Sequence, residues 1–108
     1  MSSDPFADRR AAPRVTVALP GFMTVAGRRS SVQLLDVSAG GAKLATAEAL
    51  AAGTVVDLDC GTVRRQATVR WGGGGTVGVS FDRDLDARET AALVERSTAL
   101  AARMHPAG

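Results

Sequence analysis

The chain has 108 residues, of which 13 are Lys or Arg and 11 are Asp or Glu, with one Cys and one His. This length predicts one domain with its own hydrophobic core. A single cysteine and a single histidine exclude an internal disulfide and a zinc site built from thiols and imidazoles. The one histidine, His105, lies beside the C-terminus, a poor position for a catalytic base, so most enzyme classes are disfavoured.

Positive charge comes mainly from arginine and is concentrated in the first two thirds of the chain. Residues 9–70 hold eight Arg and Lys43 against four acidic residues, whereas residues 82–108 hold four Arg against five acidic residues. GC-rich codon usage can explain the total number of arginines but not where they cluster. Arginine presents a planar, permanently charged fork that suits phosphate groups and guanine edges.

No stretch of the sequence is suited to a membrane or to export. No apolar run approaches the ~20 residues that a transmembrane helix needs. Residues 1–8 have neither the basic nor the apolar region of a signal peptide. We therefore expect a cytoplasmic protein without membrane insertion.

The expected elements begin with an arm and continue as strands. Residues 1–13 contain two prolines, small residues and charges without a period, which predicts a flexible arm. From Val15 onward, apolar and polar residues alternate, as expected of strands with one buried face. Pro20-Gly21 is expected to bend the first strand, and Gly72–Gly75 to close a hairpin, because glycine adopts positive φ without steric cost. The alternating stretches lie at residues 15–25, 31–37, 42–46, 54–60, 63–71 and 77–81.

The last two expected strands each contain one aromatic residue, and the first of the two also carries several arginines. Trp71 and Phe81 fall on the apolar faces of their strands, so both are expected to be buried. Arg65 also falls on the apolar side, so we place it at a strand end or a bulge. Arg64, Arg65 and Arg70 could bind single-stranded nucleic acid, but such sites need several exposed aromatic residues. A solvated outer face is the favoured interpretation.

After the last strand the period changes to that of a helix. Asp86 and Glu89 have the spacing of a capping box, which predicts a helix over about residues 86–104. The helix is expected to lie on the sheet or to close a barrel mouth. Together these elements predict an all-β fold over residues 14–108, a six-stranded antiparallel β-barrel with one C-terminal α-helix. The expected buried stripe of the helix consists of Leu93, Val94, Ser97, Leu100, Ala101 and Met104.

Two polar segments could together bind an anion that contains guanine. Arg9, Arg10 and Arg14 lie where the arm meets the barrel, and arginine can bind phosphate and the O6/N7 edge of guanine. Asp36 and Ser38 lie two residues apart on one strand face. A carboxylate can accept from guanine N1–H and its exocyclic amine, and a hydroxyl adds another bond.

The second segment ends in Gly40 and Gly41, which would let a ligand approach the backbone closely. Each segment alone has an ordinary explanation. A cluster of arginines is usually solvated, and an Asp-x-Ser-x-Gly-Gly stretch is usually a turn. A binding site for a guanine-containing anion is therefore predicted only from the two segments together.

The pair Arg10-x-x-x-Arg14 and Asp36-x-Ser38-x-x-Gly41 resembles the two-part signature of PilZ domains, bacterial receptors for cyclic di-GMP. The resemblance covers roughly residues 8–100, including the order of the strands and the helix. It implies a six-stranded barrel whose arginine segment wraps over the ligand on the barrel surface. The signature residues are all present.

The resemblance also implies a role for each residue. Arg10 and Arg14 would contact guanine and phosphate, Asp36 and Ser38 would hydrogen-bond a guanine, and Gly41 would provide clearance at the backbone. In this family an arginine at the position of Arg9 favours an intercalated ligand dimer over a single ligand.

We therefore expect a receptor for cyclic di-GMP that is not an enzyme and needs no cofactor. It would order its arginine arm on binding and signal through a protein partner that the sequence does not identify. One alternative is a PilZ-like scaffold that binds only proteins, which predicts no heat of binding with cyclic di-GMP. Another is a basic barrel that binds nucleic acid nonspecifically, which predicts a steep salt dependence without preference for guanine.

Overall fold

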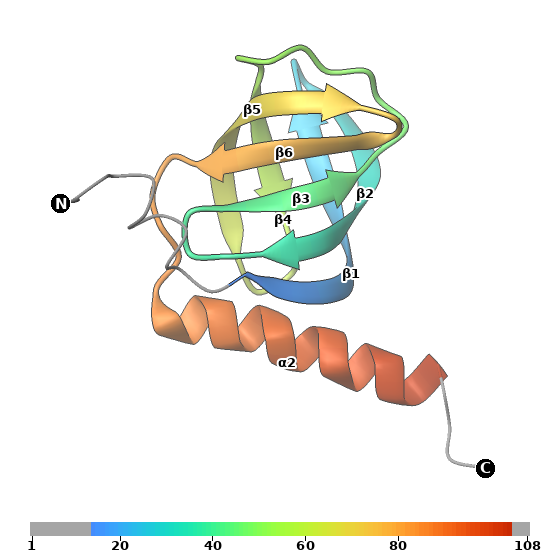
Figure 1. Cartoon of the computed structure of the whole chain (residues 1–108), viewed down its shortest axis with the longest axis vertical. Coiled ribbons are helices and arrows are strands. Elements are labelled where there is room, and N and C mark those ends of the chain that lie inside the picture. Colours follow the sequence, from blue (N-terminus) through green and yellow to red (C-terminus); the bar gives the residue numbers. More distant parts are fainter. Residues whose placement is uncertain (1–13, 105–108) are drawn as a thin grey trace, which may run out of the picture.

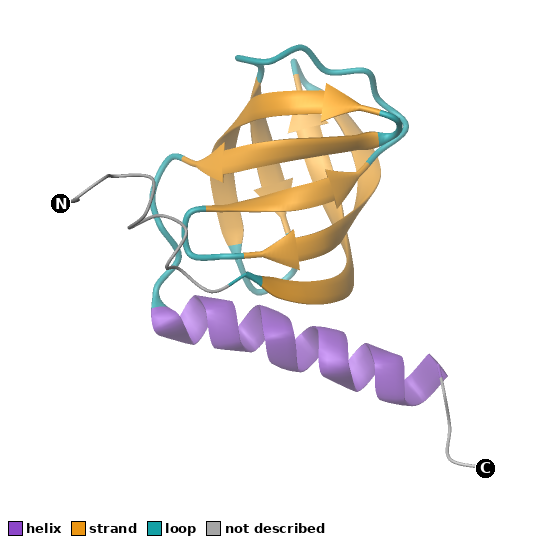
Figure 2. Ribbon diagram, viewed as in Figure 1, coloured by secondary structure: helices purple, strands orange, loops and turns teal. Residues whose placement is uncertain are grey.

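Six antiparallel strands close a barrel and a helix follows them, in a computed structural model that describes residues 14–104 (Figures 1 and 2). The strands neighbour one another in the order β1-β2-β3-β6-β5-β4, and β4 pairs back with β1 to close the barrel. The fold class predicted from the sequence is confirmed. The elements are β1 (Val15–Val25), β2 (Arg28–Val37), β3 (Gly41–Ala45), β4 (Val55–Asp59), β5 (Arg64–Gly73), β6 (Thr76–Phe81) and α2 (Ala87–Met104).

The expected flexible arm, residues 1–13, lies outside the described residues, so its boundary with the barrel stays a prediction. Within residues 14–104 no helix is long and apolar enough to cross a membrane. The hairpin expected at the glycine run is confirmed, because β5 and β6 are joined at Gly74-Gly75 and both glycines have positive φ.

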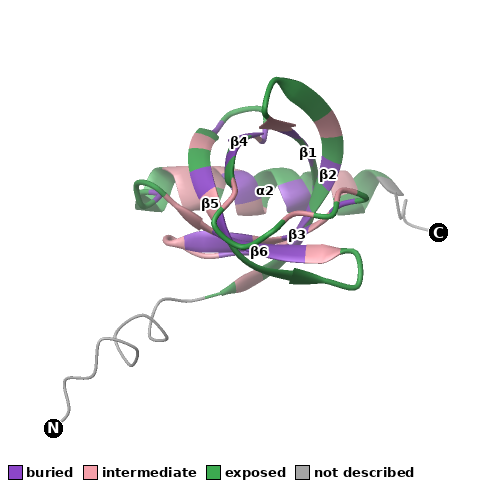
Figure 3. Cartoon of the chain, turned by 90° about the horizontal axis from the view of Figure 1, so that it is seen from above, coloured by how far each residue is buried: buried purple, intermediate pink, exposed green. Residues whose placement is uncertain are grey.

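The core fills the inside of the barrel. Alternate residues of each strand point inward, which is the period-two pattern of the sequence. Figure 3 looks into the barrel from above, where buried positions recur along the strands and α2 runs across the far end. The largest fully buried side chains are Leu19, Met23, Leu34, Leu44, Leu93, Val37, Val56 and Val69.

Strand β1 runs without interruption through Pro20-Gly21, so this pair does not divide the strand, and the expected bend stays a prediction. Gly21 is buried, and a Cβ there would lie 3.0 Å from the carbonyl oxygen of Asp59 on β4. Glycine thus lets β4 approach β1 closely and close the barrel. The pairing of β1 with β2 has a register shift between Thr16 and Leu19.

Helix α2 begins with the predicted capping box and packs against the start of β1. Glu89 N donates to Asp86 Oδ1 over 2.7 Å, and Asp86 N donates to Glu89 Oε1 over 3.0 Å. Ser97 is buried and its Oγ accepts a 2.9 Å hydrogen bond from the N–H of Ala18, which lies inside the register shift of β1. Ala101 is exposed, so the buried stripe is narrower than predicted.

Arg65, the second residue of β5, ties α2 to the barrel. Its side chain is 8% exposed, and its Nη2 lies 2.6 Å from Glu89 Oε1. Its Nε donates to the carbonyl oxygen of Arg83 over 2.9 Å. The predicted place at a strand end is confirmed, but the expected solvated position is wrong, because the apolar side of the strand end faces the start of the helix. The neighbouring Arg64 is 81% exposed.

Candidate functional site

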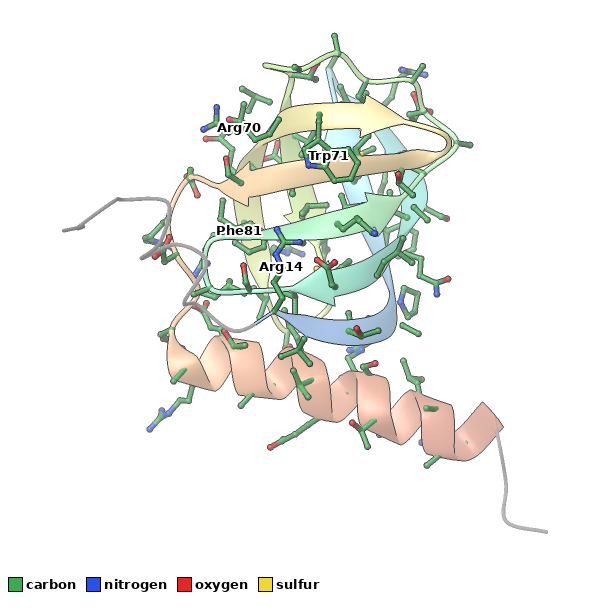
Figure 4. All side chains as sticks on the ribbon, viewed as in Figure 1. Arg14, Arg70, Trp71 and Phe81 are labelled. Atoms are coloured by element: carbon green, nitrogen blue, oxygen red, sulfur yellow. The ribbon has the colours of Figure 1, made fainter. Side chains whose placement is uncertain are left out.

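The two polar segments singled out in the sequence meet at one end of the barrel. Arg14 directly precedes β1, and Asp36 is the second-last residue of β2. Because β1 and β2 are antiparallel, Thr16 faces Asp36 in the register, so the start of one strand lies beside the end of the other. Arg14 Nη1 and Asp36 Oδ1 are 3.4 Å apart. Figure 4 shows the Arg14 side chain extended over the outer face of the barrel.

Arg14 remains available to a ligand in this arrangement. Its side chain is 64% exposed, whereas that of Asp36 is 19% exposed. An exposed ion pair of this kind contributes about 0–1 kcal/mol, because water screens it and two side chains lose freedom. Arg14 can therefore leave Asp36 for a phosphate or a base at little cost.

The loop after Asp36 is held in place by its own turn, by the end of β6 and by the connection from β6 to α2. Ser38 N donates to Gly41 O over 2.9 Å, and the Ser38 hydroxyl also points to this oxygen at 3.4 Å. Phe81 N donates to Gly40 O and Leu85 N donates to Ala39 O, each over 2.8 Å. The loop is thus a fixed platform, which favours binding without a cost for ordering it.

The two glycines of this loop have different surroundings. A Cβ at Gly41 would overlap the carbonyl oxygen of Val79, because β3 and β6 approach closely there. A Cβ at Gly40 would meet only Asp84 Oδ1, at 3.9 Å. The barrel itself therefore requires glycine at position 41, a packing role that the sequence did not reveal. Only Gly40 leaves open space beside the loop, and the ligand role of both glycines stays a prediction.

Three residues that the sequence analysis did not assign to the site, Lys43, Gly78 and Trp71, share its outer face. The register places Asp36 opposite Lys43, Lys43 opposite Gly78, and Gly78 opposite Trp71. Directly opposite residues in an antiparallel sheet point to the same side. We call these four residues, on β2, β3, β6 and β5 in turn, the outer row.

Trp71 is 48% exposed, so its predicted burial is wrong. The register between β5 and β6 shifts between Val69 and Trp71, and this shift turns the indole to the outside. Phe81 is partly buried and packs against the core, close to expectation. A signal was present in the sequence, because Gly78 interrupts the apolar run of β6 and leaves room for a large neighbour.

The remaining predicted site residues, Arg9 and Arg10, lie outside the described residues. The structure therefore brings Arg14, Asp36 and the Ser38–Gly41 loop together and leaves the first two arginines unplaced. Among residues 14–104 no group of three or more His, Cys, Asp and Glu could hold a metal ion. Burial raises the pKa of the Cys60 thiol to about 11, with Asp59 adding to the effect, so this thiol is protonated at neutral pH.

Two surface hollows of the described barrel lie away from these residues. One, of about 400 Å³, lies beside Phe22 and Arg64 on the side of β1, β4 and β5. The other, of about 510 Å³, lies between the loop at residues 46–51 and the glycine hairpin. Neither is lined by Arg14 or Asp36. A ligand at the two polar segments would lie on an open surface.

Comparison with known proteins adds a family. A family model described as PilZ domain matches residues 8–99. Among solved structures, the chain is similar to the PilZ domain of CeSA from a cellulose-synthesizing bacterium, with 16% identity, a TM-score of 0.59 and coverage of 83% of this chain and 99% of that one. No curated protein matches the sequence significantly.

The chain is also similar to the Borreliella burgdorferi PlzA protein, solved in complex with c-di-GMP, with 12% identity and a TM-score of 0.61. That match covers 84% of this chain and 44% of PlzA, so it concerns less than half of the larger protein. At these identities the likeness shows the fold. The family model, however, spans nearly the whole chain, including both polar segments. The chain belongs to the PilZ domain family.

Proposed function

We propose that this chain is a receptor for cyclic di-GMP, acts without catalysis, and binds its ligand on the outer face around Arg14 and Asp36. The observation that carries the proposal is the meeting of the two signature segments, with Arg14 Nη1 3.4 Å from Asp36 Oδ1 on an accessible surface. Membership of the PilZ family and the likeness to PlzA, solved with c-di-GMP, support it.

The chemistry of the three placed side chains fits a guanine that carries phosphate. The Asp36 carboxylate can accept from N1–H and from the exocyclic amine of guanine, which adenine cannot supply in this pattern. Ser38 adds a hydroxyl beside it. Arg14 can turn from Asp36 to a phosphate or to the O6/N7 edge of a base, as a charge-assisted and potentially bidentate contact.

Arg9 and Arg10 would complete the site from the arm. Fixing the backbone of the arm costs about 1–2 kcal/mol per residue, which charge-assisted bonds to phosphate and guanine must offset. In this proposal the arm becomes ordered over the ligand, and Arg9 supports two ligand molecules per chain.

The signal would leave through a protein partner that recognises the ordered arm and the adjoining barrel face. Gly40 O accepts a hydrogen bond from Phe81 at the end of β6, and Ala39 O accepts one from Leu85 in the segment that leads into α2, so the loop is linked directly to the entry of the helix.

Calorimetric titration with cyclic di-GMP tests the proposal, with cyclic di-AMP as the competitor. We expect binding of the guanine ligand, a large loss in Asp36→Ala, and unchanged affinity in Arg64→Ala, an exposed arginine on another face. An absence of heat would favour the protein-binding scaffold. Equal competition by cyclic di-AMP would exclude Asp36 as a reader of guanine. A one-to-one isotherm would contradict the binding of two ligand molecules per chain but not the binding of cyclic di-GMP itself.

A further inference from the structure

The wall of the barrel away from the two polar segments carries a second group of exposed side chains. Strand β1 lies between β2 and β4 there, and Thr24 on β1 faces Arg29 on β2 and Asp57 on β4. Phe22, two residues earlier on the same outer face of β1, is 43% exposed. In Figure 1, β4 and the second half of β1 lie behind β3 and β6. We call Phe22, Thr24, Arg29 and Asp57 the rear patch.

The rear patch is well separated from the proposed ligand site. Arg29 lies at the start of β2 and Asp36 near its end, which is roughly 20 Å along an extended strand. The hollow beside Phe22 is lined by three of the four patch residues and by Arg29, but not by Arg14 or Asp36. A second molecule at the rear patch would therefore leave the ligand site open.

The rear patch holds two opposite charges that are not matched within the described part of the chain. None of the ion pairs among residues 14–104 includes Arg29 or Asp57. The Arg29 guanidinium lies 4.1 Å from the centre of the Phe22 ring, and this cation–π contact holds it on the outer face. Asp57 is exposed. Both charges line the hollow of about 400 Å³, so a second molecule has room beside them.

The order of these charges is self-complementary about β1. Arg29 lies one strand to one side of Thr24 and Asp57 one strand to the other, each about 4.8 Å away. Two copies that face each other across a two-fold axis parallel to β1 would bring Arg29 of each copy onto Asp57 of the other. The same axis would bring the two Phe22 side chains together. A partner of a single charge sign would instead be repelled by one of the two charges.

We propose that the rear patch is the interface of a homodimer, in which two Arg29–Asp57 ion pairs flank a contact between the two Phe22 side chains. The inference goes beyond the proposed function and does not depend on it. The wall is curved and the contact covers three strands, which is the small interface typical of weak association, so we expect a dissociation constant in the micromolar range or above. The dimer would carry its two ligand sites on walls that face away from each other.

Sedimentation equilibrium of the full chain, from about 1 μM to about 1 mM, tests the proposal. We expect a monomer–dimer equilibrium that weakens with added salt, because the ion pairs are screened. Phe22→Ala, Arg29→Asp and Asp57→Arg should each raise the dissociation constant by about 10-fold or more, since each removes the aromatic contact or sets like charges opposite each other. Arg88→Asp is the matched control, because it makes the same change of charge at an exposed position of α2 and should leave the equilibrium unchanged.

A mixture of two variants tests the two-fold axis directly. Arg29→Asp alone and Asp57→Arg alone should both be monomeric. Mixed in equal amounts, each variant supplies at one position the charge that the other needs, so both ion pairs form again and a mixed dimer should appear. Recovery in the mixture also shows that both variants are folded, and thermal melting establishes the same for Phe22→Ala.

Each outcome supports or overturns the inference independently of the proposed function. A monomer at every concentration would overturn the dimer, and a dimer that none of the three substitutions weakens would overturn the rear patch as its interface. Loss of the dimer in both charge variants without recovery in their mixture would overturn the two-fold arrangement. Calorimetry with cyclic di-GMP should give Arg29→Asp the affinity of the unmodified chain, and an absence of heat in both would contradict the receptor but not the dimer.

Discussion

Arg14 directly precedes β1, and its side chain contacts Asp36 near the end of β2, so it links the two signature segments of the candidate site. Arg14→Lys keeps the charge but loses the planar fork. We expect this change to weaken binding of cyclic di-GMP by roughly 1–3 kcal/mol, the scale of one bidentate guanine contact. Calorimetry measures the loss, with Arg64→Ala as the control. Near-normal affinity in Arg14→Lys would mean that only charge matters at this position.

The neighbouring glycines of the loop give a second prediction at the scale of the residue. Gly41→Ala places a methyl group against the carbonyl oxygen of Val79 and should lower the free energy of unfolding by about 1–3 kcal/mol, as overpacking does. Gly40→Ala meets only open space and a distant carboxylate, so its stability should be nearly unchanged. Chemical denaturation measures both variants.

The same pair also separates a packing role from a ligand role. If the ligand approaches the loop backbone as proposed, Gly40→Ala should weaken binding although its stability is normal. Equal stability of the two variants would contradict the close approach of β3 and β6 at Gly41.

At the scale of the element, the attachment of α2 depends on one buried arginine. Arg65 is 8% exposed and bonds Glu89 and two backbone carbonyl oxygens at the entry to the helix. Arg65→Ala removes the donor that these three acceptors share, leaving Glu89 Oε1 only its bond from Asp86 N, and should lower the free energy of unfolding by about 1–3 kcal/mol. Arg64→Ala, one residue earlier and 81% exposed, should change it by less than about 0.5 kcal/mol. Urea denaturation of the two variants is the measurement, and similar midpoints would contradict the anchoring role.

At the scale of the whole molecule, ligand binding should protect the amides of the arm and of the loop from hydrogen exchange and should leave exchange in the rest of the barrel unchanged. Amide exchange at saturating cyclic di-GMP should slow across residues 8–14 and residues 36–41. The strand β4 lies on another side of the barrel and should change little, which makes it the internal reference. Unchanged exchange in the arm would mean that the arm does not close over the ligand and that the signal leaves by another route.

The sequence by itself determined which elements form. Alternation of apolar and polar residues predicted the strands, the glycine run predicted the hairpin, and Asp86 with Glu89 predicted the start of the helix. These signals are local, because a strand with one buried face and a capped helix each follow from residues a few positions apart. The same holds for the two signature segments, which are readable as residue patterns before any contact is known.

The tertiary structure decided what the local patterns could not. The order of the strands brings Arg14 to Asp36 and aligns the outer row, and no local pattern states which strand pairs with which. A register shift turned Trp71 outward, because alternation assigns faces only while the register is unbroken, and one extra residue reverses every later side chain. Arg65 is buried because a helix begins over its strand end, a neighbour 24 residues away in the chain. The candidate site therefore depends on contacts between distant segments, and these exist only once the barrel has closed.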